Sequence, residues 1–296
     1  MNINKVLNNP RLAQAILGVS RKEFLSLLET FEQILYEHRD SKNRKRIVGG
    51  GAKGNIKSAQ QKLFYILFYI KNYPTYDTAA FIFGSSKSRT HGWTQAILPL
   101  LEKTLGRKVV LPQRQLASPE EFFRKFPGVK EVMIDGVERP THRPKKEKTQ
   151  KKHYSGKKKR HTRKNIVMTD PTKKILVLTP SKHGKVHDKR LTDKNILMPN
   201  IPKDIDVYTD TGFLGVQKEH GNVFMPKKKP RNGFLTQEEK EINKIISFFR
   251  IGVEHAIGGM KRFRCVSDTY RNRNGIDDGF ALVSAGLWNF HLEMQG

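Results

Sequence analysis

The sequence predicts an α/β protein: a mixed sheet flanked by helices, preceded by an all-α N-terminal region. Three observations support this fold class. Apolar residues recur at helical spacing up to about residue 115. Strand-like runs occur only after residue 116, at 131–138, 162–169, 174–179 and 204–209. Helical patterns then close the chain, and this order of elements favours a mixed sheet with helices packed on it.

The charge of the chain is strongly basic. Its 296 residues include 56 Lys and Arg against 28 Asp and Glu, a formal net charge of +28. Because this much positive charge repels itself, we expect a polyanionic partner. Charge alone does not separate a nucleic-acid enzyme from a ribosomal or packaging protein. The hydrophobic fraction of 36% is enough for one or two cores, which excludes a disordered basic tail.

We expect a soluble protein of about two domains in a reducing cytoplasm. The longest apolar run, residues 63–70, is too short to cross a bilayer, and residues 1–5 do not start a signal peptide. A single cysteine, Cys265, excludes a disulfide scaffold and a multi-cysteine metal site.

The N-terminal region begins with a capped helix and a basic linker. Ser20 and Glu23 form a capping-box pattern, and apolar residues follow at helical spacing until about Asp40. Residues 41–57 are basic and rich in glycine, which is typical of a solvated linker; a DNA-contacting arm is the alternative.

Residues 58–102 predict three helices in a helix-turn-helix arrangement. Ser58 caps the first, Pro74 ends it, and a second helix runs from about Thr75 to Phe83. A turn at Gly84 leads to a polar third helix, which would enter a DNA groove. A plain helical bundle is the alternative. The candidate DNA-contacting residues on the third helix are Lys87, Ser88, Arg89, His91 and Gln95, beside Gly92, whereas Trp93, Ile97 and Leu101 should pack inward.

The remaining chain predicts the α/β domain. A short helix follows the N-cap Ser118, and residues 170–173 form a hairpin turn between two strands. A helix of about a dozen residues is expected between Gly184 and Pro199. Thr236 opens a helix that reaches about Ile257, and a last helix spans residues 280–292. The predicted domains are therefore 1–57, 58–115 and 116–296.

Three acidic residues are the candidate catalytic groups. Asp135 and Asp210 each end an apolar strand and precede a glycine-containing turn, where a ligand can approach the backbone closely. Glu254 lies on the Thr236 helix one turn from Arg250, at the border of the apolar face. Each aspartate alone is more often a turn residue, and Glu254 alone would be half of a surface ion pair. The two aspartates in one sheet, joined by a matching glutamate, favour a site.

The three carboxylates favour a hard divalent cation, Mg²⁺ or Mn²⁺. Pairs of such ions, about 3.5–4 Å apart, stabilise the attacking and leaving oxygens in phosphodiester displacement. We expect two ions per active site, because an acidic pocket in so basic a chain is explained by metal that offsets carboxylate–phosphate repulsion.

A basic tract lies between the first two predicted strands. Residues 139–164 contain thirteen Lys and Arg and one glutamate. Its position beside Asp135 favours contacts with the DNA backbone, and a solvated charge run or a localisation signal is the alternative. The candidate contact residues are Lys157, Lys158, Lys159 and Arg160. A second cluster, residues 227–231, adjoins the helix of Glu254.

Four blocks of sequence resemble the insertion-sequence-5 family of transposases, relatives of the eukaryotic Harbinger transposases. The blocks are residues 135–140, 154–162, 184–189 and 253–263, and the resemblance covers roughly residues 58–275. It implies an RNase H-like catalytic domain with an Asp-Asp-Glu triad, here Asp135, Asp210 and Glu254. It also implies that the helix-turn-helix binds the terminal inverted repeats of a mobile element.

Related transposases carry a Tyr-x2-Arg-x3-Glu-x6-Lys signature. Arg250, Glu254 and Lys261 match its last three positions, whereas Ser247 stands at the tyrosine position. The resemblance implies that Arg250 and Lys261 position the DNA backbone, Lys261 against a phosphate or a flipped base.

The sequence therefore predicts a prokaryotic, nucleoid-associated DNA transposase that acts as a homodimer on double-stranded DNA. Metal-dependent hydrolysis cuts the element ends, and the freed 3′-hydroxyl attacks target DNA. A domesticated, catalytically silent DNA-binding regulator is the alternative. A general RNase H-like nuclease would cut without specific ends, and a ribosomal-type binder would not need the three acids.

Overall fold

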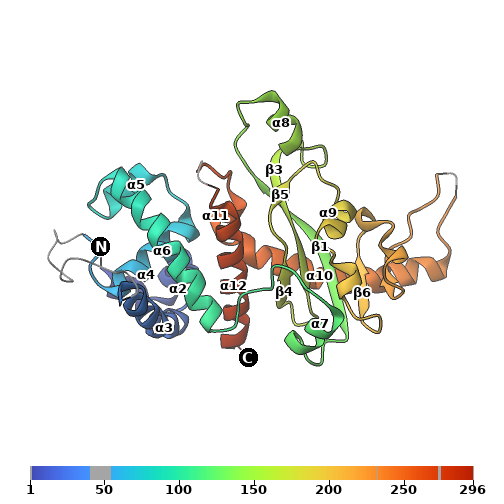
Figure 1. Ribbon diagram of the computed structural model, residues 1–296, viewed down its shortest axis with the longest axis horizontal. Helices are drawn as coiled ribbons and strands as arrows, with labels where there is room; N and C mark the ends of the chain where they lie inside the picture. Colours follow the sequence, from blue (N-terminus) through green and yellow to red (C-terminus); the bar gives the residue numbers. More distant parts are fainter. Residues whose placement is uncertain (1, 41–54, 232, 273–274, 296) are drawn as a thin grey trace. The chain divides into compact units, whose positions relative to one another are not determined.

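The computed structural model describes residues 2–40, 55–231, 233–272 and 275–295, in two compact units (Figure 1). The helical unit comprises residues 1–111, 261–268 and 274–296, and the α/β unit comprises residues 112–260 and 269–273. The C-terminal helix thus belongs to the same unit as the N-terminal helices. Most of the predicted linker, residues 41–54, lies outside the described residues. The three-domain division stays a prediction.

Eight helices build the described part of the helical unit. They are α1 (Ile3–Leu7), α2 (Pro10–Leu17), α3 (Arg21–Asp40), α4 (Ala59–Asn72), α5 (Tyr76–Ile82), α6 (Lys87–Arg107), α11 (Arg264–Ser267) and α12 (Asp277–Gln295). The predicted helices at 21–40, 58–72, 75–83 and 87–102 are confirmed. The sequence analysis missed α1 and α2, which begin after the N-caps Asn2 and Asn9.

Local capping explains where these helices start. The Ser20 hydroxyl accepts from the Glu23 N–H at 3.2 Å, and the Glu23 carboxylate accepts from the Ser20 N–H at 2.5 Å, which confirms the predicted capping box. Ser58 and Gln61 form a second box at the start of α4. Each box satisfies backbone donors that the first helical turn leaves unpaired.

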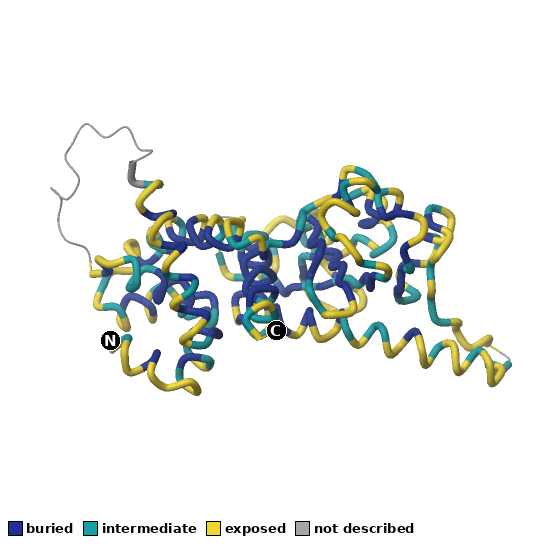
Figure 2. The backbone as a smooth tube through the Cα atoms, turned by 90° about the horizontal axis from the view of Figure 1, so that it is seen from below, coloured by how far each residue is buried: buried dark blue, intermediate teal, exposed yellow. Residues whose placement is uncertain are grey.

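Helix α4 is the centre of the helical unit. Its apolar run, residues 63–70, is buried except for a half-buried Phe68, so the helix is covered on all sides (Figure 2). It contacts α2, α3, α6 and α11. Within this core the Tyr65 hydroxyl donates to the Thr90 carbonyl oxygen at 2.7 Å and lies 2.8 Å from the Thr94 hydroxyl. Burial raises the pKa of Tyr65, so the phenol stays protonated.

Replacing Tyr65 with Phe should lower the free energy of unfolding by about 1–2 kcal/mol, because the Thr90 carbonyl and the Thr94 hydroxyl lose a buried partner. Urea unfolding followed by circular dichroism measures this loss. Tyr36→Phe is the matched control, since Tyr36 is exposed on α3 and its replacement should change stability by less than about 0.5 kcal/mol. Equal effects of the two substitutions would contradict the assignment.

The α/β unit is built on one sheet. Its strands are β1 (Glu131–Pro140), β2 (Tyr154–Ser155), β3 (Arg160–Thr169), β4 (Ile175–Leu178), β5 (Lys182–His183), β6 (Asp206–Thr209) and β7 (Val223–Phe224). The order is β2-β3-β1-β6-β7, with β4 and β5 also paired to β3. β1 runs antiparallel to β3 and parallel to β6. This confirms the predicted mixed sheet and is consistent with the RNase H-like fold.

Helices cover both faces of this sheet. They are α7 (Pro119–Lys125), α8 (Glu147–His153), α9 (Asp188–Lys194) and α10 (Gln237–Lys261), with short 3-10 helices at 198–200, 211–213 and 216–218. One face of the sheet carries Val132 and Ile134 in a core that includes residues of α7 and α9. On α10, Phe249 stacks on Tyr208 at 4.4 Å between ring centroids, and Gly252 lies against Met133. Alternation along β1 therefore places Asp135, like Met133, on the side of α10.

Three predictions for this unit need correction. The helix expected over about a dozen residues ends after seven, at Lys194, since Ile196 adopts a left-handed φ of 48°. The Thr236 helix continues through Gly258 and Gly259 to Lys261, because burial of Ile257 and Met260 outweighs the weak helix propensity of glycine. The tract 139–164 is more than a connection, since it contains α8 and β2.

The N-terminal half of α10 is largely exposed (Figure 2). No helix within the described ranges is long and apolar enough to traverse a bilayer.

Candidate active site

The parallel pairing of β1 and β6 brings Asp135 and Asp210 together. The last paired residues are Ile134 and Thr209, so the two aspartates are the next residues on adjacent strands. Each carboxylate accepts a backbone hydrogen bond from a glycine that follows it in the chain. Asp135 accepts from the Gly136 N–H at 2.6 Å, and Asp210 accepts from the Gly212 N–H at 2.7 Å. The turn predicted after Asp135 was wrong, because β1 continues through Gly136 to Pro140, whereas Asp210 directly follows the end of β6.

A third aspartate, Asp188 in the first turn of α9, lies against the same two glycines. A β-carbon on Gly136 would lie 2.6 Å from its Oδ1 atom, and a β-carbon on Gly212 would lie 3.2 Å from its Oδ2 atom. Only glycine leaves room for the carboxylate at both positions. Sequence reasoning missed Asp188 as a site residue, although it stands in the block 184–189 that carries the family resemblance.

The three carboxylates act on one another electrostatically. Burial raises the pKa of Asp135, and the neighbouring charges of Asp210 and Asp188 raise it further. The Gly136 N–H and the Arg250 guanidinium oppose this rise. The site therefore concentrates negative charge beside a single strand end.

A buried ion network holds Asp188 in place. Glu138 and Lys164 face each other across β1 and β3, with side chains only 5% and 7% exposed. The Lys164 ammonium lies 3.3 Å from Glu138 Oε1 and 2.9 Å from Asp188 Oδ1, and it donates to the Val186 carbonyl oxygen at 3.1 Å. One cation thus ties β1, β3 and the start of α9 together.

Glu138 is the anchor of this network. Burial by itself would raise the pKa of Glu138, but hydrogen bonds from Thr162 and Ser155 and the charge of Lys164 bring it below its usual range. The Thr162 hydroxyl donates to Glu138 Oε2 at 2.7 Å. Glu138 therefore stays ionised, and Lys164 keeps the counter-charge that it needs in a buried position.

Glu254 is placed differently from the aspartates. Its carboxylate lies 3.8 Å from Arg250 Nη2, and its side chain is 59% exposed against 21% for Arg250. Arg250 also acts on Asp135, so it stands between the helix and the strand end. Among the residues that the structure describes, no three Asp, Glu, His or Cys side chains are arranged closely enough to hold a metal ion. The roles predicted for Asp135, Asp210 and Glu254 remain predictions.

The helix-turn-helix presents the start of α6 to solvent. Lys87, Ser88 and Arg89 are exposed there, after the N-cap Ser86. Lys87 pairs with Asp77 on α5 at 2.8 Å. His91 and Gln95 are half-buried, and the His91 ring contacts Tyr76 at 5.2 Å between centroids. Of the residues expected to pack inward, Ile97 and Leu101 are buried and Trp93 is half-buried.

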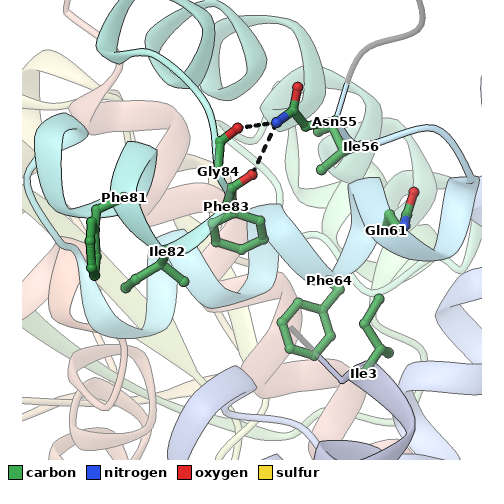
Figure 3. Close-up of a pocket in the computed structure, with 9 residues that line it drawn as sticks. All are labelled: Ile3, Asn55, Ile56, Gln61, Phe64, Phe81, Ile82, Phe83 and Gly84. Carbon is green, nitrogen blue, oxygen red and sulfur yellow. Dashed lines mark hydrogen bonds between the residues drawn. The ribbon is translucent and has the colours of Figure 1, made fainter.

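Asn55 fixes the turn that precedes α6. Its side-chain amide donates to the carbonyl oxygens of Phe83, at 3.5 Å, and Gly84 (Figure 3). Gly84 itself has a φ of 58°, which glycine adopts without strain. The neighbouring cavity of about 360 Å³ is lined by Phe64, Phe81 and other apolar side chains (Figure 3).

The remaining predicted contact residues are exposed. Lys157, Lys158, Lys159 and Arg160 follow β2 and lead into β3, and Lys261 is the last residue of α10.

Comparison with known proteins assigns the class. Residues 134–289 match the DDE superfamily endonucleases, and residues 56–107 match the helix-turn-helix of the same superfamily. The chain belongs to the DDE superfamily of endonucleases, and its partner is DNA. It is 30% identical over 279 residues to a probable transposase for insertion sequence element IS702 from Microchaete diplosiphon, covering 94% of this chain and 93% of that protein. No solved structure matches the chain.

The superfamily generally uses divalent metal ions. The chemistry of the acidic side chains suits such an ion, although in the described part of the chain they are not arranged closely enough to enclose one. Asp135, Asp188 and Asp210 offer only carboxylate oxygens, the ligands that Mg²⁺ and Mn²⁺ prefer. Burial is the main reason that the pKa of Asp135 is raised, and the charges of Asp210 and Asp188 add to the rise. A dication would offset the charge of the three carboxylates.

Gly136→Ala should reduce DNA cleavage about 100-fold, because its β-carbon would clash with Asp188 Oδ1 and displace a carboxylate by a substantial part of an ångström. The measurement is a nicking assay, with thermal unfolding to verify the fold. Gly221→Ala is the control, since its β-carbon would meet no atom within 4 Å. Unchanged cleavage by Gly136→Ala would mean that the position of Asp188 does not matter.

Proposed function

We propose that this protein is a DNA transposase that binds the terminal inverted repeats of an insertion sequence and catalyses metal-dependent strand cleavage and strand transfer. The observation that carries the proposal is that Asp135 and Asp210 follow the last paired residues of the parallel strands β1 and β6, with Asp188 against Gly136 and Gly212, in a chain of net charge +28. The similarity to the probable IS702 transposase over nearly the whole chain supports it. Membership of the insertion-sequence-5 family and action as a homodimer belong to the same proposal.

In this proposal the carboxylates of Asp135, Asp210 and Glu254 hold Mg²⁺ or Mn²⁺, two ions per site, and Asp188 completes the oxygen ligands. When bound, the ions offset the repulsion between carboxylates and phosphate and stabilise charge on the attacking and leaving oxygens. Hydrolysis of the phosphodiester leaves a 3′-hydroxyl at the element end. That hydroxyl then attacks a target phosphodiester and displaces the target 3′-oxygen.

The basic residues have a separate role. Arg250 lies beside Asp135 and Glu254, where its guanidinium can hold a phosphate at the site of attack. The exposed Lys157, Lys158, Lys159 and Arg160 would contact the DNA backbone without reading sequence. Lys261 would serve the same purpose at the end of α10.

Asp135→Asn, Asp210→Asn and Glu254→Gln should each abolish cleavage while leaving inverted-repeat binding within about twofold of the wild type, because each removes one charge without changing the side-chain shape. A metal-dependent nicking assay and a gel-shift titration on the same inverted-repeat DNA measure the two properties. Cleavage at the wild-type rate by the Asp135→Asn protein would refute the catalytic assignment.

The same assay separates the proposal from its alternatives. A catalytically silent regulator is favoured by one observation, the 59% exposure of the Glu254 side chain, and it predicts binding to inverted repeats with no cleavage. A general nuclease predicts cleavage of any duplex at equal rates.

Arg89→Ala should weaken binding to the inverted repeat by about 1–3 kcal/mol and relax its sequence preference, because Arg89 is exposed in the first turn of α6. Competition gel shifts against a scrambled duplex measure both effects. Arg11→Ala, an exposed arginine on α2, is the control for loss of charge alone. Equal losses for the two variants would place DNA reading elsewhere.

A further inference from the structure

A second pocket lies within the basic tract. We name it the Tyr154 pocket. It has a volume of about 630 Å³, and it is lined by residues of α8, β2, the start of β3 and the segment before α9. This volume lies within the range of small-ligand sites, about 300–1,000 Å³.

The walls of the Tyr154 pocket combine positive charge with an aromatic ring. Arg143, Lys151 and Lys185 supply the charge, and none of the described residues that line the pocket is acidic. The Arg143 guanidinium donates to Gln150 Oε1 at 3.0 Å, which fixes a polar amide in the wall. Glu147, which pairs with Lys151 at 2.8 Å, lies outside the lining. A ligand of this pocket should carry negative charge and hydrogen-bonding groups.

The aromatic ring is held in place yet accessible. Tyr154 pairs with His161 between β2 and β3, and their rings meet edge to face at 5.7 Å between centroids. Tyr154 nevertheless remains 45% exposed. A fixed, partly open aromatic face beside cations is the arrangement on which proteins stack unpaired bases.

Strands β1 and β3 link the pocket to the candidate active site. The Thr141 N–H, six residues after Asp135, donates to the His161 carbonyl oxygen at 2.9 Å. Six residues of extended chain span about 20 Å. Since successive nucleotides along one DNA strand rise about 3.4 Å, this distance corresponds to about six nucleotides. Lys185 also lies next to Val186, whose carbonyl binds the Lys164 ammonium of the ion network.

We propose that the Tyr154 pocket binds one unpaired nucleotide of the DNA substrate, about six nucleotides from the bond that is cut. The base stacks on Tyr154 and contacts Gln150, and Arg143, Lys151 and Lys185 hold its phosphate. The inference rests on the proposed function for the identity of the substrate as element-end DNA. It assigns to the basic tract, residues 139–164, a binding site for a single base in addition to contacts with the DNA backbone.

The test compares the affinities of a fully paired inverted-repeat duplex and of duplexes with one mismatched nucleotide, moved through positions three to nine from the cut. Binding is measured by fluorescence anisotropy without divalent ions, so that the DNA stays intact. Because a mismatched base is already partly unpaired, the wild type should bind tighter when the mismatch is near position six. Tyr154→Ala should remove that advantage, a loss of about 5- to 150-fold.

Three variants sharpen the result. Tyr154→Phe keeps the ring and should retain the preference, whereas Tyr36→Ala removes an exposed aromatic residue from α3 and should have no effect. Lys185→Gln should reduce the number of counterions released on binding by about one for every duplex. This variant tests the pocket even if Tyr154→Ala does not fold. The proposal is overturned if the wild type prefers no mismatch position, or if its preference survives in the Tyr154→Ala protein.

The outcome is separable from that of the proposed function. If the wild type cuts DNA, Asp135→Asn does not, and no mismatch preference exists, the function stands and the pocket proposal fails. If a Tyr154-dependent preference exists but the wild type never cuts, the pocket proposal stands and the catalytic assignment fails.

Discussion

The site depends on one buried cation. Lys164 sits between Glu138 and Asp188 with little access to water, and its charge would be very costly there without both carboxylates. By binding residues of β1, β3 and the start of α9 at once, it fixes the strand pairing and places Asp188 beside Asp135. The same ion network therefore pairs charges across β1 and β3 and holds Asp188 against Gly136.

Much of this fold could be predicted because its signals are local. Capping boxes such as Ser20 with Glu23 act within four residues, so the sequence alone locates the helix starts. The two candidate aspartates could be found for the same reason, since each follows an apolar run and precedes a glycine. The turn expected after Asp135 was wrong, because β1 continues through Gly136 to Pro140. The continuation of α10 through Gly258 and Gly259 could not be predicted, because burial against the rest of the protein outweighs the weak helix propensity of glycine there.

The parts of the site that escaped prediction are non-local. Glu138 and Lys164 are 26 residues apart, and only the register of β1 against β3 makes them neighbours. Asp188 reaches the strand ends because Gly136 and Gly212 lack side chains, a fit that no spacing in the sequence reveals. The Tyr154 pocket likewise arises from the pairing of β2 with β3 inside a tract whose composition indicates only charge.

The chain order of the helical unit has a consequence for biosynthesis. Helix α12 contacts α3 and α6, and the Asn289 amide donates to the Val110 carbonyl oxygen at 2.9 Å, across 179 positions of sequence. Residues of the α/β unit emerge from the ribosome between these partners. Helix α6, the third helix of the helix-turn-helix, therefore gains its last supporting contacts only after the α/β unit has been synthesised, which delays a fully assembled helix-turn-helix on a nascent chain until translation is nearly finished.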